Sequence, residues 1–202
     1  MPQSSTQPNH TNQQDNLTNI KEYFIKATHQ AGIKTRIVPC VLELEFATLS
    51  SLNLNQVAKE YQILGEQGND IISQAMHFLN KESDNANAMI IELLAQIYQK
   101  VARIERAMMR ESADFIALEK NASISAFGHG VICCQEECFV VGEEYYARFV
   151  LPNVLQRIIG VYAKSITPQI IQFTSIHSSD TAVLDNYIAH KEIEQLREQR
   201  TK

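Results

Sequence analysis

Three cysteines and a histidine that lie close together in the chain are of the residue types that bind zinc. Cys134 and Cys138 have the spacing of half a zinc site, and Cys133 and His129 are nearby. A tetrahedral site needs a second pair of ligands, but the remaining histidines are scattered along the sequence. Cysteines in strands are usually small core residues. We therefore expect no metal site and no cofactor.

Titratable side chains are not spaced for catalysis. Each histidine stands alone, without the Ser and Asp or the Cys that would build a nucleophilic constellation. The carboxylate pairs Glu136-Glu137 and Glu143-Glu144 fall near predicted turns, and we interpret them as solvated loop charges and not as a general acid and base. We therefore expect that the protein is not an enzyme.

Length and composition exclude several classes of protein. The chain has 202 residues, of which 45% are hydrophobic, enough for one core and an appendage. Its 18 basic and 23 acidic residues give a net charge of -5, which does not favour nucleic-acid binding. No apolar run is long enough to span a membrane, and the polar start, Met1 to Asn16, is not a secretory signal. Because the four cysteines lack a framework spacing, we expect a cytoplasmic protein.

The first part of the chain changes from a polar tail to a strand. Residues 1–19 contain almost nothing to bury, and we predict that they are disordered. Residues 20–54 are predicted to begin a β domain. They hold a short helix, Ile20 to Gln30, and a strand, Arg36 to Thr48, in which apolar residues alternate with Glu43 and Glu45.

Residues 55–112 have helical periodicity in two runs, and we predict an inserted coiled-coil region of two long helices. Alternating three-and-four spacing lets a helix keep one narrow apolar stripe against a partner by supercoiling. The second run supplies the predicted oligomerisation seam: Asn87, Ile90, Leu94, Ile97, Val101, Ile104 and Met108. Asn87 takes an a position, where a buried Asn typically fixes register and oligomer state.

Residues 113–202 are predicted to be a β domain that ends in a helix. Turn-type residues separate most of its short apolar runs, which suggests a small barrel or sandwich. The closing helix has an apolar face at Val183, Leu184, Tyr187 and Ile188. The expected strands are Phe115 to Leu118, Gly130 to Cys134, Cys138 to Val141, Tyr145 to Leu151, Leu155 to Ala163 and Ile170 to Ser175.

The segment Ser123 to Gly128 resembles the D/N-x-S-x-x-G motif of PilZ domains. The strand pair from Val131 to Val141, Gly142 before a strand and the strand ending Leu151-Pro152 are similar to the layout of that family. The resemblance implies an α+β protein: a six-stranded antiparallel β-barrel with two long inserted heptad-repeat helices and a C-terminal helix. It also implies bacterial regulation of motility, pili or exopolysaccharide, in many members through cyclic di-GMP.

The ligand motif of this family also has an R-x-x-x-R element ahead of the first strand, whose guanidiniums grip phosphates. Here that string occurs at Arg106 and Arg110, inside the predicted insertion, and Ser123 stands where the family has Asp or Asn. We interpret the arginines as a solvated flank of the coiled coil and expect that cyclic di-GMP does not bind. The alternative is a receptor with a degenerate site, whose candidate residues are Arg106, Arg110, Ser123, Ser125 and Gly128.

The arrangement resembles tetrameric PilZ proteins of xanthomonads that do not bind the ligand. It implies a homo-oligomer, with a tetramer favoured, that contacts pilus-assembly or signalling proteins. The helices alternatively form a hairpin on their own barrel, and the spacing alone does not separate the two arrangements.

Overall fold

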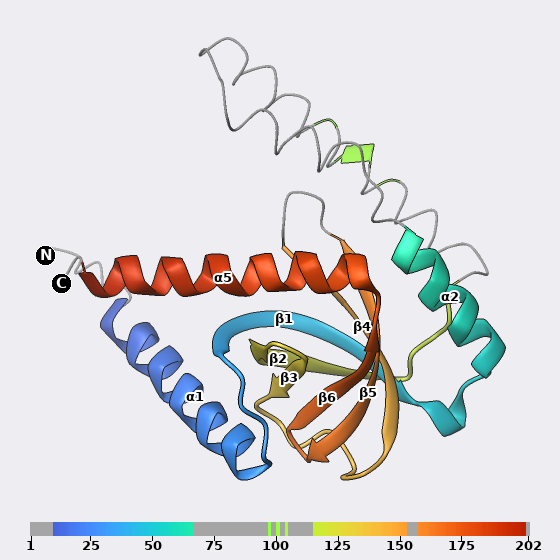
Figure 1. Cartoon of the computed structure of the whole chain (residues 1–202), viewed down its shortest axis with the longest axis horizontal. Coiled ribbons are helices and arrows are strands. Elements are labelled where there is room, and N and C mark those ends of the chain that lie inside the picture. The colour runs from blue at the N-terminus through green and yellow to red at the C-terminus, as the bar shows by residue number, and fades with distance from the viewer. Residues whose placement is uncertain are drawn as a thin grey trace, which may run out of the picture.

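The computed structural model describes residues 10–66, 115–152 and 157–200, and also Ile97, Lys100, Val101 and Ile104. The elements follow in the order α1 (His10–Gln30), β1 (Ile37–Thr48), the 3-10 turn η1 (Leu49–Ser51), α2 (Leu54–Glu66), β2 (Lys120–Gly128), β3 (Val131–Cys134), β4 (Glu144–Val150), β5 (Ile158–Thr167), β6 (Ile170–Ile176) and α5 (Ser178–Arg200). Figure 1 shows α5 lying across one end of the sheet, and α1 and α2 lying on opposite sides of the sheet. Within the described ranges, no helix is long and apolar enough to cross a membrane.

The strands in these ranges close into one antiparallel barrel in the order β1-β2-β3-β6-β5-β4. The strand β1 joins the two ends of the sheet, because Leu42 lies opposite Ile124 of β2 and Leu44 lies opposite Phe149 of β4. A closed barrel leaves no unpaired sheet edge of full length. The six-stranded antiparallel barrel that the family resemblance implies is therefore confirmed for the described residues.

The barrel interior and α5 share the main core. The alternation in β1 places Leu44 and Phe46 inside, as its period of two predicts. From α5, Leu184 and Ile188 enter the same core, so the C-terminal helix covers the barrel end with the predicted apolar face. Fully burying such a side chain stabilises the fold by roughly 1.5–3 kcal/mol.

A second, smaller core lies between α1 and the outside of the barrel. Phe24 is almost fully buried there, together with Ile37, Ala126, Val131, Cys133 and Ile170. The helix begins at His10, which corrects the prediction of a disordered segment up to residue 19 and a helix from Ile20. The sequence from His10 to Gln30 contains neither Gly nor Pro, so no residue in it breaks the helix. Residues 1–9 lie outside the described part of the chain.

Two predicted strands are wrong, and in each a specific hydrogen bond replaces strand pairing. The amide of Ile116 donates to Glu60 Oε2 of α2 at 2.7 Å, and residues 115–118 form an irregular segment held against this helix. The amides of Cys138 and Phe139 both donate to the carbonyl of Pro168 at 3.0 Å, so residues 138–141 form a loop. The strand that the pattern misses is β2, which contains the motif-like segment Ser123 to Gly128.

Between β1 and β2 the structure describes the helix α2, which begins at Leu54, and the segment from residue 115 that returns to the barrel. Of the second predicted helix, the described residues Ile97, Lys100, Val101 and Ile104 have helical backbone. The rest of the insertion, including Asn87, Ile90, Leu94 and Met108 of the seam, lies outside the described residues.

Candidate functional site

The residues predicted as a degenerate ligand site are only partly described. Ser123 is exposed on β2, Ser125 is buried on the same strand, and Gly128 ends it. Arg106 and Arg110 lie outside the described residues. The residue opposite Ser123 on β1 is Glu43, which is also exposed. A carboxylate beside the motif serine disfavours a phosphate there through like-charge repulsion.

Gly128, the last residue of the motif-like segment, lies in close packing contact with the segment before β1. A Cβ at this position would lie 2.8 Å from Cγ2 of Thr35 and 2.9 Å from the carbonyl oxygen of Arg36. The segment entering β1 therefore passes directly over Gly128. The guanidinium of Arg36 points to α5, where its Nη1 lies 3.2 Å from Glu192 Oε2 in an exposed ion pair.

An apolar stripe lies on the described part of the insertion. Ile97, Val101 and Ile104 are 58%, 54% and 61% exposed, respectively. Their spacing of four and then three residues puts all of them on one face of a helix. These residues belong to the predicted seam, and their exposure leaves that face open to a further partner.

A buried ionic network, missed by the sequence analysis, anchors α2 to the barrel. The carboxylate of Glu60 accepts hydrogen bonds from Arg148 Nη1 at 2.8 Å, Tyr146 Oη at 3.1 Å and the amide of Ile116 at 2.7 Å. Burial, followed by the negative charge of Glu60, raises the pKa of Tyr146, so its phenol remains a donor. Glu60 lies three residues after Val57 and four before Leu64, both of which are buried. This spacing is the sequence signal that places Glu60 on the buried face of α2.

Arg148 also connects the two chain segments that flank the insertion. Its Nε lies 2.9 Å from Glu45 Oε2 on β1, and its guanidinium carbon lies 4.9 Å from the ring centre of Phe115. One β4 side chain thus contacts the strand before the insertion, the first inserted helix through Glu60, and the returning segment. The root of the insertion is fixed to the barrel by charge-assisted hydrogen bonds.

The C-terminal end of α2 contacts the start of α5. Ser179 Oγ donates to the carbonyl of Gly65 at 3.2 Å and accepts from Arg157 Nη2 at 2.9 Å. A Cβ at Gly65 would lie 2.2 Å from Cδ2 of His177, so only glycine fits this contact. Arg157 also pairs with Asp180, whose Oδ2 is buried without a hydrogen-bond partner.

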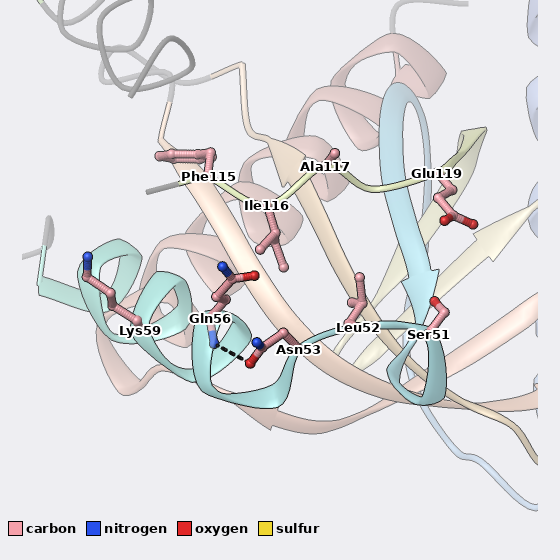
Figure 2. Close-up of a pocket in the computed structure, with 9 residues that line it drawn as sticks. All are labelled: Ser51, Leu52, Asn53, Gln56, Lys59, Phe115, Ile116, Ala117 and Glu119. Carbon is pink, nitrogen blue, oxygen red and sulfur yellow. Dashed lines mark hydrogen bonds between the residues drawn. The ribbon is translucent and has the colours of Figure 1, made fainter. Parts of the chain in front are cut away.

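A pocket of about 430 Å³ lies at the root of the insertion, where the departing and returning segments meet. In Figure 2, Asn53 and Gln56 at the start of α2 face the returning residues Phe115 and Ile116. Asn53 Oδ1 accepts from the amides of Asn55 at 3.0 Å and Gln56 at 3.4 Å, which satisfies free donors of the first helical turn. Lys59 and Glu119 lie toward opposite ends of the pocket (Figure 2).

The cysteines considered as zinc ligands face different parts of the core. Cys133 packs in the core under α1, whereas Cys134 belongs to the barrel interior and Cys138 packs against it. Adjacent residues of a strand point to opposite faces, so Cys133 and Cys134 cannot share a site. Among the residues that the structure describes, no three His, Cys, Asp or Glu side chains are grouped so as to hold a metal ion.

Comparison with known proteins gives one distant structural resemblance. No family model matches the chain, and no curated protein matches it. A crystal structure of a pathogenic protein from Xanthomonas campestris, described as a new tetrameric PilZ domain self-assembled through an unusual helical bundle, is similar over 80% of this chain and 88% of its own. The identity is 12% and the TM-score is 0.38, which is too distant to assign this chain to a family.

Proposed function

We propose that the protein is a non-catalytic, PilZ-like adaptor that self-associates through its inserted helices and acts through protein contacts. The observation that carries the proposal is the exposed stripe Ile97, Val101 and Ile104. Each of these side chains gains roughly 1.5–3 kcal/mol when it moves from water into a packed interface. A copy of the same stripe is a self-complementary partner, as in a heptad bundle.

The anchoring of α2 supports this role. Arg148 holds the middle of α2 through Glu60, and Ser179 holds the C-terminal end of this helix through Gly65. The insertion therefore starts from a rigid root. A rigid root lowers the entropy that association costs. The family resemblance favours a tetramer that serves type IV pili, motility or cyclic di-GMP-linked signalling.

The adaptor does not bind cyclic di-GMP itself in this proposal. The exposed carboxylate of Glu43 lies opposite Ser123, and the net charge of -5 opposes a dianionic ligand. The segment that enters β1 brings Arg36, which pairs with Glu192.

Light scattering on the full chain tests the oligomer. We expect a multimer in the wild type and a lower mass in Ile97→Lys and Ile104→Lys, because a lysine in the interface loses its hydration. Val141→Lys is the matched control, since Val141 on the barrel is 59% exposed, close to the 61% of Ile104. An unchanged mass in both stripe variants, or a monomeric wild type at micromolar concentration, contradicts the proposal.

The alternative function is a cyclic di-GMP receptor with a degenerate site. The exposed position of Ser123 on β2 favours it, since a ligand can reach that hydroxyl. Calorimetric titration with the dinucleotide separates the two functions. Micromolar binding that is lost in Arg106→Ala, and weakened in Ser123→Ala, would replace the adaptor by the receptor.

A further inference from the structure

Cys134 and Cys138 are held against the same turn of the barrel. Cys134 ends β3, and its amide donates to the carbonyl of Gln169 at 2.8 Å. The amide of Cys138 donates to the preceding carbonyl, that of Pro168, at 3.0 Å. Two consecutive carbonyls of the β5–β6 turn therefore fix both backbones, and Cys138 packs against the barrel core to which Cys134 belongs.

The two sulfurs differ in exposure and in protonation. Cys134 is fully buried, whereas Cys138 is partly open to solvent. The interaction with the Cys134 thiol lowers the pKa of Cys138; partial burial opposes this without reversing it, and the charges of Lys120 and Glu136 act in opposite directions. The same interaction, followed by burial, raises the pKa of Cys134. The pair thus consists of a partly exposed sulfur whose pKa is lowered and a buried thiol whose pKa is raised.

The other two cysteines provide an internal comparison. Cys40 is buried on β1, and burial raises its pKa to about 12. Cys133 is completely buried under α1, and burial raises its pKa as well. Buried thiols of raised pKa react slowly, because the thiolate is the nucleophile.

We propose that Cys138 and Cys134 form a reversible thiol-oxidation site that reacts with small hydroperoxides. The thiolate sulfur of Cys138 attacks the terminal peroxide oxygen, the O–O bond breaks, and the other oxygen takes up a proton and leaves as water from hydrogen peroxide or as an alcohol from an alkyl hydroperoxide. The resulting sulfenic acid is attacked by the sulfur of Cys134. The S–O bond then breaks, a disulfide forms, and the proton of Cys134 leaves with the hydroxide as water.

The electrons balance in this sequence. Two thiol groups together lose two electrons and two protons, and one hydroperoxide accepts them. A small dithiol reverses the oxidation by exchange through a mixed disulfide. The disulfide closes the loop between β3 and Cys138, next to the exposed residues Val140 and Val141. The site does not depend on self-association, so its test is separate from that of the oligomer.

The experiment exposes the full chain to stoichiometric hydrogen peroxide, blocks the remaining thiols with an alkylating agent, and maps the cysteines by fragmentation mass spectrometry. We expect loss of two hydrogen atoms, assigned to a bond between Cys134 and Cys138, and recovery with a dithiol. Native alkylation before oxidation should modify Cys138 at least about tenfold faster than Cys40.

Variants separate the roles of the two thiols. In Cys134→Ser we expect a sulfenic acid at Cys138 that dimedone traps, and in Cys138→Ser we expect no rapid oxidation. Cys133→Ala is the matched control and should still form the disulfide, since Cys133 faces the other core. A bond from Cys138 to Cys133 or Cys40, or oxidation of Cys138 no faster than of Cys40, overturns the proposal. The wild-type mapping decides this even if a variant fails to fold.

Discussion

Arg148 of β4 and Glu60 of α2 form a buried ion pair, with 2.8 Å between Nη1 and Oε1, and their side chains are 11% and 1% exposed. The pair joins the barrel to the first inserted helix across 88 residues of sequence. A buried pair of this kind stabilises a particular arrangement when every polar atom has a partner, because an unpaired buried charge is costly. The ion pair therefore fixes the orientation of α2 against the barrel.

Loss of one partner should therefore destabilise the fold strongly. In Arg148→Met we expect the free energy of unfolding to fall by about 3–5 kcal/mol, since Glu60 is left buried and uncompensated. In the double variant Glu60→Leu/Arg148→Met much of this loss should be recovered. Urea unfolding followed by circular dichroism measures both. Equal losses in the single and double variants would show that packing, and not the unpaired charge, is responsible.

The contact of Gly65 with His177 predicts a steric effect with a built-in rescue. Gly65→Ala should lower the free energy of unfolding by about 1–3 kcal/mol, because the new Cβ would overlap the imidazole, which lies 2.2 Å from its position. His177→Ala removes the ring, so the double variant should lose less than the sum of the two single variants. Thermal unfolding of the four proteins provides the test, and strict additivity of the losses would exclude the contact as their cause.

Asp180 predicts a pH dependence of stability. Burial raises the pKa of Asp180 above 3.8, and pairing with Arg157 opposes this without reversing it. At pH values between 3.8 and the higher native pKa, Asp180 holds a proton in the native state that it releases in the unfolded state. The corresponding stability is fully present below 3.8 and is lost as the pH rises through the native pKa.

The variant Asp180→Asn removes this titration and keeps an oxygen that accepts from Arg157. The free energy of unfolding of the wild type minus that of Asp180→Asn should therefore decrease as the pH rises through the window. Urea unfolding at a series of pH values measures it. An increase over the same window would mean that the attraction of Arg157 exceeds the cost of burial.

Predictions from the sequence succeeded where the signal was local and periodic. Alternation predicted β1, and the apolar face of α5 is buried as expected. They failed at residues 115–118 and 138–141, where apolar composition was typical of strands. There, hydrogen bonds to Glu60 and to Pro168 decide the conformation, and both partners are distant in sequence.

The sequence by itself therefore predicted the strand β1, a small β domain after residue 113 and a closing helix with an apolar face. Only the tertiary structure decided that Glu60 is buried opposite Arg148, and that the β5–β6 turn holds Cys138 beside Cys134. The physical reason is the range of the interactions. Periodicity reflects which face of one element is buried, whereas these pairs depend on the register in which separate elements meet.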